Sequence, residues 1–561
     1  MGVCCMCAGR KIDKGPVNSL LAAQAARMRA FAQDDSGAMA APTVFFFLAM
    51  LAVGGIGIDL MRMERDRTVL QYTLDRAVLA AADLDQPLAP EAVVLDYLSK
   101  AGLQEYYQTP IVDQGLGYKK VESTINATFD THMLEFSGGG DMPIYANSRA
   151  EESIDGVEIS LVLDVSGSMK SNSRLTNLKV AAKDFVDTMV ANTTDGKMSI
   201  SIVPYATQVS LPEELIEQYN VDRPQTYANC INFKSQHFDT AGVSTTEALE
   251  GSMLIDPWYN HDTRSDGSVL RYTVCEPDVE REVLLFEKNA TTLKTFIDRL
   301  QAWGNTSIDI GMKWGTALLD PSAQPVISAL SAGADAIVPA QFSNRPAAYT
   351  DHETVKVIVL MTDGQNTSQY YMNSDYRSGN TGVWYDTTSE VYSTYDSSND
   401  RYFWHNRSIW MDHPYGERPG TTYCYKWYYG SCTRTATEGG SPATLSELTM
   451  PELYAYKSVK SVYYMFREWM GSTSARNKWY NNVYSSYGNS TKNTRTRAIC
   501  QAAKDQGIIV FTIGFEAPSN GVAVLQDCAS SDAHYFDVDG LEISDAFASI
   551  ATSIRQLRLT Q

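Results

Sequence analysis

Oxygen-bearing side chains alternate in the segment LVLDVSGSMK, residues 161–170. Asp164, Ser166 and Ser168 follow an apolar run, EISLVL, which has the composition of a buried strand. These residues could supply a nucleophilic aspartate, a nucleophilic serine or a set of oxygen ligands for a hard metal ion. Alternation on an extended turn points Ser166 and Ser168 the same way. Gly167 between them allows the backbone to pass close to an ion.

The two nucleophile interpretations lack their catalytic companions. An aspartate nucleophile of the haloacid-dehalogenase type needs a second carboxylate two residues further on, where this chain has Ser166. The GxSxG pattern of a serine hydrolase is absent around Ser166 and Ser168. The sequence also contains neither a GxxxxGK[ST] phosphate loop nor an HExxH zinc pair. We therefore expect a binding protein and not an enzyme.

Two further segments offer oxygen ligands. The predicted strand at residues 355–361 ends in Thr362 and Asp363, and Thr306 lies in the connection WGNTSIDIG. Ligands of open α/β sheets bind beyond the carboxyl ends of the strands, so these residues can meet Asp164 and the serines at one edge. Mg2+ takes about six oxygens and keeps some waters, which suits few carboxylates and several hydroxyls. We expect Mg2+, with Mn2+ or Ca2+ as alternatives.

The elements that must position these residues alternate between strand and helix from residue 153 to residue 558. This alternation predicts an α/β fold with a doubly wound, mostly parallel sheet. The predicted strands are 157–163, 198–205, 208–211, 355–361, 508–515 and 534–538, with 208–211 in an antiparallel edge pair; the predicted helices are 175–190, 292–302, 307–319, 494–506, one near 522, and 541–557. Two stretches are too long for loops and are expected to be insertions, at about 212–289 and 365–493.

The second insertion is rich in aromatic residues. It holds 19 of the 32 tyrosines and 6 of the 9 tryptophans, mixed with short polar residues, a composition that favours a recognition surface. The alternative is an insert whose aromatic rings build a core of its own, and residues 452–470 have the pattern of a packed helix. Because this insertion begins directly after Asp363, we expect it at the rim of the metal site, where it would select the partner.

The N-terminal part differs in character. Residues 36–58 carry no charge and are long enough to cross the roughly 30 Å hydrocarbon layer, which predicts a single transmembrane helix. Residues 1–35 are expected to be a cytoplasmic segment, and residues 59–152 a helical stalk followed by a small α+β region. Cys4, Cys5 and Cys7 are interpreted as incidental, and translation can begin at Met1 or at Met28.

Charge excludes one class of partner, and cysteine usage indicates a compartment. A net charge of -20 without clustered Lys and Arg argues against nucleic-acid binding.

Six cysteines follow the span, an even number that suits an oxidising compartment. We therefore expect the large C-terminal part to lie outside the cytosol.

The motif DVSGSM with a downstream Thr and TDG resembles the metal-ion-dependent adhesion site of von Willebrand factor A domains. The resemblance covers about residues 157–557 without the insertions and implies a Rossmann-like fold. It also implies a metal site formed by Asp164, Ser166, Ser168, Thr306 and Asp363, in which the serines and threonine touch the ion and the aspartates act through water. A bound ion in that family takes an acidic residue of a partner protein.

The segment FAQDDSGAMAAPTVFFFLAMLAVGGIGIDLMRM and the Ala-rich helix after it resemble TadE/TadG-like Flp pilus-assembly proteins. The resemblance implies one bacterial inner-membrane anchor ahead of a periplasmic or extracellular domain that binds a pilus or envelope component. An alternative with the same metal site is a surface adhesin that contacts host or neighbouring cells. Cys500 and Cys528 resemble a cysteine pair of that family. The predicted disulfides, among fifteen possible pairings, are Cys500–Cys528, Cys424–Cys432 and Cys230–Cys275.

Overall fold

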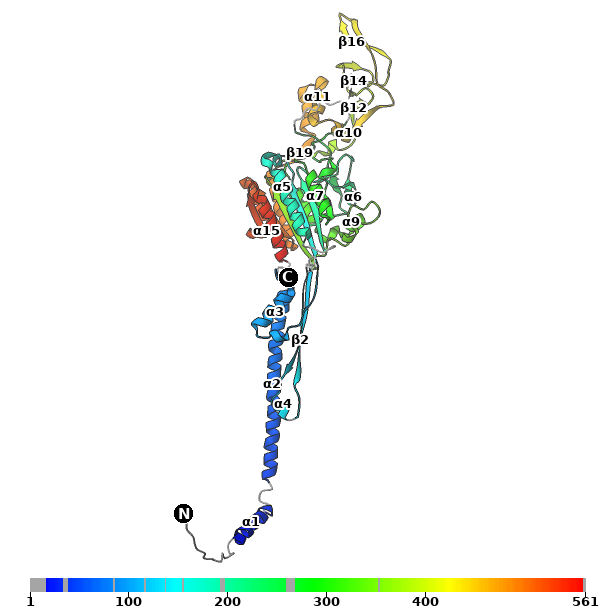
Figure 1. The fold of residues 1–561 in the computed structure, drawn as a ribbon. Coiled ribbons are helices and arrows are strands. Elements are labelled where there is room, and N and C mark those ends of the chain that lie inside the picture. The colour runs from blue at the N-terminus through cyan, green and yellow to red at the C-terminus, as the bar shows by residue number, and fades with distance from the viewer. Residues whose placement is uncertain are drawn as a thin grey trace, which may run out of the picture. The chain divides into compact units, whose positions relative to one another are not determined.

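The computed structural model describes residues 17–33, 39–83, 86–115, 118–136, 138–153, 156–191, 197–258, 268–351 and 354–557. It forms two compact units (Figure 1). Unit 1 contains residues 1–114 and 118–152, and unit 2 contains residues 115–117 and 153–561. Cys4, Cys5 and Cys7 lie outside the described residues, as do the first three residues of the predicted span.

Unit 1 combines a long helix with a small sheet. Its elements are α1 (Val17–Ala32), α2 (Ala40–Ala82), α3 (Pro90–Lys100), η2 (Gln104–Tyr106), β1 (Ile111–Gly115), β2 (Tyr118–Phe129), α4 (Met133–Phe136) and β3 (Met142–Ser153), with the strands in the order β1-β2-β3. Leu74 and Val78 of α2 pack against Val94 of α3 and Ile125 of β2. The predicted stalk and α+β region are thus one packed body.

The first part of α2 is the candidate membrane span. Among the described residues, α2 is the one helix whose length and apolar composition are sufficient to cross a membrane. Its second part carries charged residues and buries its apolar side chains in unit 1. One apolar helix near the N-terminus fits a single-pass membrane anchor.

The main sheet of unit 2 has six strands among the described residues. They are β4 (Gly156–Asp164), β5 (Met198–Tyr205), β9 (Leu284–Glu287), β10 (Thr354–Thr362), β20 (Ile509–Phe515) and β21 (Tyr535–Val538), in the order β21-β20-β10-β4-β5-β9. The first five strands are parallel, and β9 pairs antiparallel with β5. The parallel pattern brings the carboxyl ends of β4 and β10 to the same edge.

Two predictions about the outer strand beside β5 are wrong. Residues 208–211 form no strand, and Ser210 makes only an isolated bridge with Glu282. A two-residue hairpin after β5 would need left-handed residues, which Ala206 and Thr207 disfavour. The antiparallel edge strand is β9, which lies inside the range predicted as the first insertion, so that insertion ends before residue 284.

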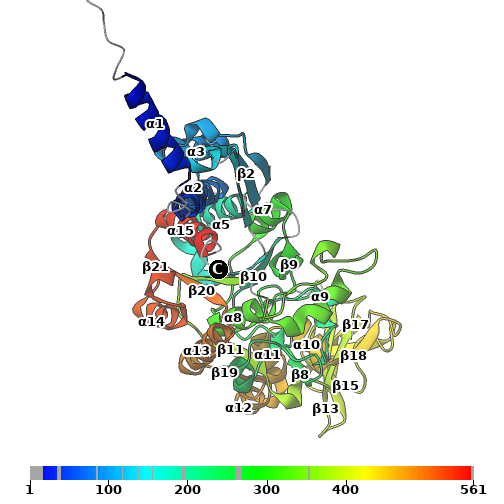
Figure 2. The same ribbon diagram turned by 90° about the horizontal axis from the view of Figure 1, so that it is seen from below.

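Helices cover both faces of the sheet (Figure 2). One face packs against α5 (Arg174–Ala191), α7 (Ala290–Arg299) and α15 (Glu542–Leu557). The other face packs against α8 (Ile308–Ala317), α13 (Asn489–Asp505) and α14 (Ser519–Cys528). Side chains of β4 alternate between these two cores, with Leu161 and Leu163 in the first and Val162 in the second.

The insertions form further small sheets and helices. Their elements are α6 (Glu213–Ile216), β6 (Val221–Asp222), β7 (Ile231–Asn232), β8 (Leu249–Gly251), β11 (Gln369–Met372), β12 (Asn380–Asp386), β13 (Val391–Asp396), β14 (Arg401–Trp404), β15 (Ile409–Met411), β16 (Thr422–Tyr428), β17 (Ser431–Thr437), β18 (Leu445–Thr449), α10 (Met450–Tyr456), α11 (Val459–Met470), α12 (Ser472–Arg476) and β19 (Tyr484–Tyr487). α9 (Gln324–Leu330) follows α8. The second insertion leaves and re-enters the main fold through the antiparallel pair β11–β19.

The two insertions share one apolar core. Met253 and Ile255 of the first pack with Phe466 and Trp479 of the second, whose rings stack with centroids 4.1 Å apart. Many aromatic residues of the second insertion therefore build its own core. The exceptions form the tip of the hairpin β16–β17, where Trp427, Tyr428 and Tyr429 are 64%, 67% and 91% exposed.

The three predicted disulfides are confirmed. Cys230 is bonded to Cys275, Cys424 to Cys432 and Cys500 to Cys528. The first closes part of the first insertion, the second joins β16 to β17 and the third joins α13 to α14. Each insertion and the main fold therefore has one covalent crosslink.

Candidate metal site

Asp164 is fixed at the end of β4 by two hydrogen bonds. The backbone N–H of Ser166 donates to Asp164 Oδ1 at 2.7 Å, and Thr362 Oγ1 donates to Asp164 Oδ2 at 2.6 Å. Asp164 and Ser166 are buried. The neighbouring strand β10 thus supplies the residue that orients this carboxylate, as expected from the shared edge.

The two serines connect Asp164 to Asp363. Ser166 Oγ lies 3.1 Å from Ser168 Oγ, and Ser168 Oγ donates to Asp363 Oδ1 at 2.7 Å. Asp363 is buried, whereas Ser168 is exposed. The structure therefore brings these predicted residues into one hydrogen-bonded chain, which begins at Asp164 with the Ser166 N–H and is exposed to solvent at Ser168.

Thr306 borders the same space. An atom placed at the Cβ position of Gly364 would lie 3.8 Å from Thr306 Oγ1 and 3.9 Å from Ser168 Oγ. Among the described residues, no hydrogen bond involves Thr306 Oγ1. Gly167 also has a role that was not predicted. Its N–H donates to the Gly304 carbonyl at 2.9 Å, and a side chain there would crowd that oxygen, so this glycine lets two loops meet.

The oxygen spacing fits a hard divalent cation. Adjacent ligands of an octahedral Mg2+ lie about 2.9 Å apart when each metal–oxygen distance is about 2.0–2.1 Å. The Oγ atoms of Ser166 and Ser168, both expected to be direct ligands, lie 3.1 Å apart, close to that spacing. Among the described residues, no group of three or more His, Cys, Asp and Glu side chains could hold a metal. A site here therefore depends on hydroxyl ligands.

The electrostatics of the cluster favour a cation. Burial, and then the nearby Asp363 carboxylate, raise the pKa of Asp164 to about 7. Burial also raises the pKa of Asp363, although hydrogen bonds from Ser168 and Arg174 oppose the increase. Two buried carboxylates that repel one another are stabilised in their charged forms by a nearby positive charge.

Arg174 supplies one such charge and was not predicted from the sequence. Its guanidinium is bonded to Asp363 Oδ2 at 2.8 Å and to Glu516 Oε2 at 2.8 Å. It is the first residue of α5, directly after the loop that carries the two serines. Arg174 is not an oxygen ligand, so the ligand pattern did not include it. Its place six residues after Ser168 was nevertheless a signal that a positive charge lies near the predicted carboxylates.

Lys492 links the loops behind the cluster. Its Nζ donates to the Thr306 carbonyl at 2.7 Å, to Ser307 Oγ at 2.6 Å and to the Thr367 carbonyl at 2.8 Å. The side chain is completely buried, and burial lowers its pKa to about 8. Lys492 therefore holds the Thr306 loop against the segment that follows Asp363.

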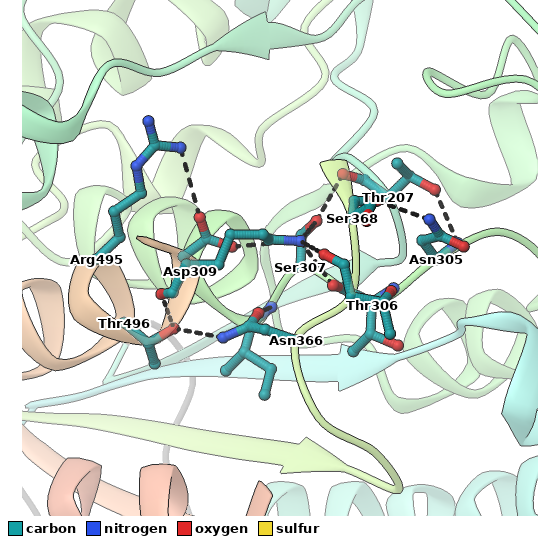
Figure 3. Close-up of polar contacts among 12 residues, drawn as sticks. Thr207, Asn305, Thr306, Ser307, Asp309, Asn366, Ser368, Arg495 and Thr496 are labelled. Atoms are coloured by element: carbon teal, nitrogen blue, oxygen red, sulfur yellow. Dashed lines mark hydrogen bonds and ion pairs between the residues drawn. The ribbon is translucent and has the colours of Figure 1, made fainter. Parts of the chain in front are cut away.

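A buried polar network extends this linkage (Figure 3). Asp309 lies 3.9 Å from Lys492 Nζ and 3.8 Å from Arg495. Asn366 accepts the N–H of Ile308 at 2.8 Å and donates to Thr496 Oγ1 at 3.0 Å. The network therefore connects α8 and α13 with the loop after β10.

The start of the second insertion contacts the Thr306 loop directly. Thr306 N–H donates to Thr367 Oγ1 at 2.8 Å, and Asn305 Nδ2 donates to the Ser368 carbonyl at 2.7 Å. Ser368 is followed immediately by β11. The first residues of the second insertion are thus hydrogen-bonded to the candidate site. Lys492 lies just after the last strand of this insertion, β19.

Comparison with known proteins identifies one segment. Residues 37–84 match the TadE/G-like Flp pilus-assembly family, so the chain carries a pilus-assembly domain there. No curated protein sequence matches the chain. The segment includes the whole of α2, both its apolar part and its continuation into unit 1, as the resemblance predicted.

Solved structures give weak similarities. The von Willebrand factor domain of the type V pili tip protein Mfa5 from Porphyromonas gingivalis is 13% identical, with 72% of this chain and 96% of that chain covered and a TM-score of 0.30. The adhesive tip pilin GBS104 from Group B Streptococcus agalactiae is 12% identical, with coverages of 71% and 100% and a TM-score of 0.30. The PilB minor pilin from Streptococcus sanguinis is 13% identical, with coverages of 80% and 77% and a TM-score of 0.27. Such scores do not establish a shared fold.

Proposed function

We propose that this protein is a membrane-anchored, metal-dependent binding protein that takes part in Flp/Tad-type pilus assembly or anchoring. Unit 2 is then a doubly wound domain of the von Willebrand A type. The proposal is carried by the hydrogen-bonded chain from Asp164 through Ser166 and Ser168 to Asp363 at one edge of the sheet. The pilus-assembly domain at residues 37–84 supports the biological setting.

The residues of the site determine what can bind. Ser166, Ser168 and Thr306 would contact Mg2+, with Asp164 and Asp363 acting behind them, and Mn2+ and Ca2+ are alternatives. Neutral hydroxyl ligands leave much of a bound ion's charge uncompensated, which favours a carboxylate from a partner protein. Binding of a partner requires no nucleophile, so the proposed function is not enzymatic. The partner is a pilus or envelope component that presents an acidic residue.

Calorimetry of the full-length protein in detergent tests the metal site. Ser166→Ala combined with Ser168→Ala should abolish Mg2+ binding, because both hydroxyl ligands are lost. Ser171→Ala combined with Ser173→Ala is the matched control, since these exposed serines lie in the same loop. Equal Mg2+ binding by the wild type and the first variant would show that the proposed ligands are wrong.

Partner capture tests the role of the second insertion. We expect Mg2+-dependent capture of envelope proteins by immobilised wild-type protein, and loss of capture with a chelator. Deletion of residues 371–487 should abolish capture while Mg2+ binding remains. Capture that survives the deletion would contradict the role of the insertion in partner selection.

The proposed location is the bacterial inner membrane, with a single pass through α2 and with unit 2 in the periplasm or outside the cell. Two observations support it. One apolar helix precedes the domain, and all six cysteines after it are paired in disulfides, which persist in oxidising compartments.

A further inference from the structure

The short helix α4 lies beside the apolar part of α2. It connects β2 to β3, and its first residue, Met133, contacts Gly55 of α2. A Cβ atom on Gly55 would lie 2.8 Å from Met133 Cβ, so even an alanine would force the two segments apart. Gly55 is within the uncharged run that ends at Ile58. This contact places α4 level with the end of the candidate membrane span.

The exposure of α2 changes at this point. From Ala40 to Gly54 the helix is exposed on all sides, apart from the half-buried Ala49. Gly55 is the first buried residue of the helix, and α4 covers it. An apolar helix surface that is exposed all round requires lipid, because water would not solvate it favourably. α4 therefore covers one side of α2 from Gly55 onward, while Ile58 and Met61 are still 52% and 69% exposed.

Asp59 holds α4 in this position. Its Oδ2 accepts the backbone N–H groups of His132, Met133 and Leu134 at 3.0, 2.6 and 2.9 Å. Asp59 lies four residues after Gly55, or about 6 Å further along the helix axis. This charged residue and the contact at Gly55 fix both ends of a short attachment between α4 and the helix.

The exposed residues of α4 suit the headgroup layer. Met133 is 51% exposed, although it also contacts α2. Glu135 is exposed, and its charge is compatible with the hydrated interface but not with the hydrocarbon. Arg62, one turn beyond Asp59, is paired with Asp59 Oδ1 at 3.7 Å and is 39% exposed, so its charge also lies at this level of the helix. Interfacial segments bury their apolar side chains about 5–10 Å into the boundary of headgroups and acyl chains.

We propose that α4 lies in the headgroup layer of the bilayer that α2 crosses, with Met133 in contact with phospholipid, and that Asp59 sets this depth. The proposal rests on the proposed membrane anchor. It gives the β2–β3 hairpin a function, because a second membrane contact beside the span restricts the tilt and the vertical movement of the anchor.

Tryptophan quenching in reconstituted full-length protein tests this proposal. All nine native tryptophans lie at or after Trp258, so unit 1 has none, and an introduced tryptophan is measured as the difference from the parent protein. Phe46→Trp marks the middle of the span. Met133→Trp reports on α4. Tyr72→Trp is the control, because Tyr72 is 61% exposed and lies about 26 Å beyond Gly55 along α2.

In vesicles that contain brominated phosphatidylcholine, the added emission of Phe46→Trp and Met133→Trp should each fall roughly twofold or more, while that of Tyr72→Trp stays unchanged. Quenching of Phe46→Trp with no quenching of Met133→Trp would overturn the proposal but leave the anchor intact. No quenching of Phe46→Trp would overturn the anchor itself. Asp59→Ala added to Met133→Trp should reduce the quenching; unchanged quenching would remove the role assigned to Asp59.

Discussion

At the scale of single residues, the candidate site depends on a buried side chain that lies behind the proposed metal ligands. Lys492 is buried and bonded to Thr306, Ser307 and Thr367. These three hydrogen bonds use the full donor capacity of its ammonium group. Lys492 therefore helps to hold the Thr306 loop, together with the hydrogen bonds that join this loop to Thr367 and Ser368.

Lys492→Met should weaken Mg2+ binding roughly tenfold, as the loss of an outer partner of a metal ligand does. It should also lower the free energy of unfolding by about 3 kcal/mol, because Asp309 loses part of its buried charge compensation. Calorimetry and thermal unfolding measure the two effects. Lys356→Met is the matched control, since Lys356 is another buried lysine, bonded to Glu158 and Leu319 on the same domain. If both variants keep wild-type affinity, Lys492 does not position the site.

Lys313 should make stability depend on pH. Its Nζ donates to the carbonyls of Thr240 and Gly242, both at 2.7 Å, and burial lowers its pKa from 10.5 to about 7. Between these two values the unfolded chain binds a proton that the folded protein lacks, so the free energy of unfolding rises with pH in this window. Unfolding measured from about pH 7 to pH 10 should show a shallower rise for Lys313→Met. Identical slopes would contradict this prediction.

At the scale of elements, the hairpin β16–β17 is the exposed part of an otherwise packed insertion. Tyr429 and Gly430 both have positive φ angles, 43° and 74°. The first position of such a turn favours Asn or Gly over Tyr. An exposed tyrosine at that position does not stabilise the turn. Its presence there therefore favours a role for Tyr429 in recognition. The Cys424–Cys432 disulfide joins the two strands beneath it.

Replacement of Trp427, Tyr428 and Tyr429 by Ser should reduce Mg2+-dependent partner capture at least tenfold with little change in stability, because exposed aromatic anchors contribute affinity and not folding energy. Pull-down titration and thermal unfolding measure the two effects. The control replaces Val180, Val279 and Leu541 by Ser; these residues are 48%, 71% and 77% exposed on the same unit. Similar losses in both triple variants would indicate a general surface effect.

The disulfide between α13 and α14 closes a loop with a sequence separation of 28. Replacement of Cys500 and Cys528 by Ser should lower the free energy of unfolding by about 3 kcal/mol, through the larger entropy of the open unfolded chain. Chemical unfolding under non-reducing conditions measures this loss. A variant as stable as the wild type would show that the crosslink does not lower the conformational entropy of the unfolded chain enough to stabilise the fold.

At the scale of the whole molecule, the access of protease to unit 2 on cells distinguishes the two proposed functions, assembly factor and surface adhesin. We expect unit 2 to resist protease added to intact cells and to be digested after the outer membrane is permeabilised, because the anchor would hold it in the periplasm. Immunoblotting against unit 2 measures its survival, with a known surface protein and a known periplasmic protein as controls. Digestion on intact cells would favour the adhesin.

The sequence by itself determined the features that depend on local pattern. Hydrophobic runs marked β4 and β10, and their polar endings marked Asp164 and Asp363, because the carboxyl ends of parallel strands meet at one edge. The uncharged run before Asp59 indicated the candidate membrane helix, since a span requires about 20 consecutive apolar residues. The even number of cysteines after the span indicated disulfides, and the family resemblance indicated the pair Cys500–Cys528.

Only the tertiary structure decided the features that depend on distant contacts. No local pattern shows that β9 takes the edge of the sheet, that Met253 shares a core with Phe466, or that Lys492 contacts Thr306 across 186 residues. The contact of Met133 with Gly55 is of the same kind. Periodicity records which face of an element is buried, but the partner that buries it is selected by packing over the whole fold.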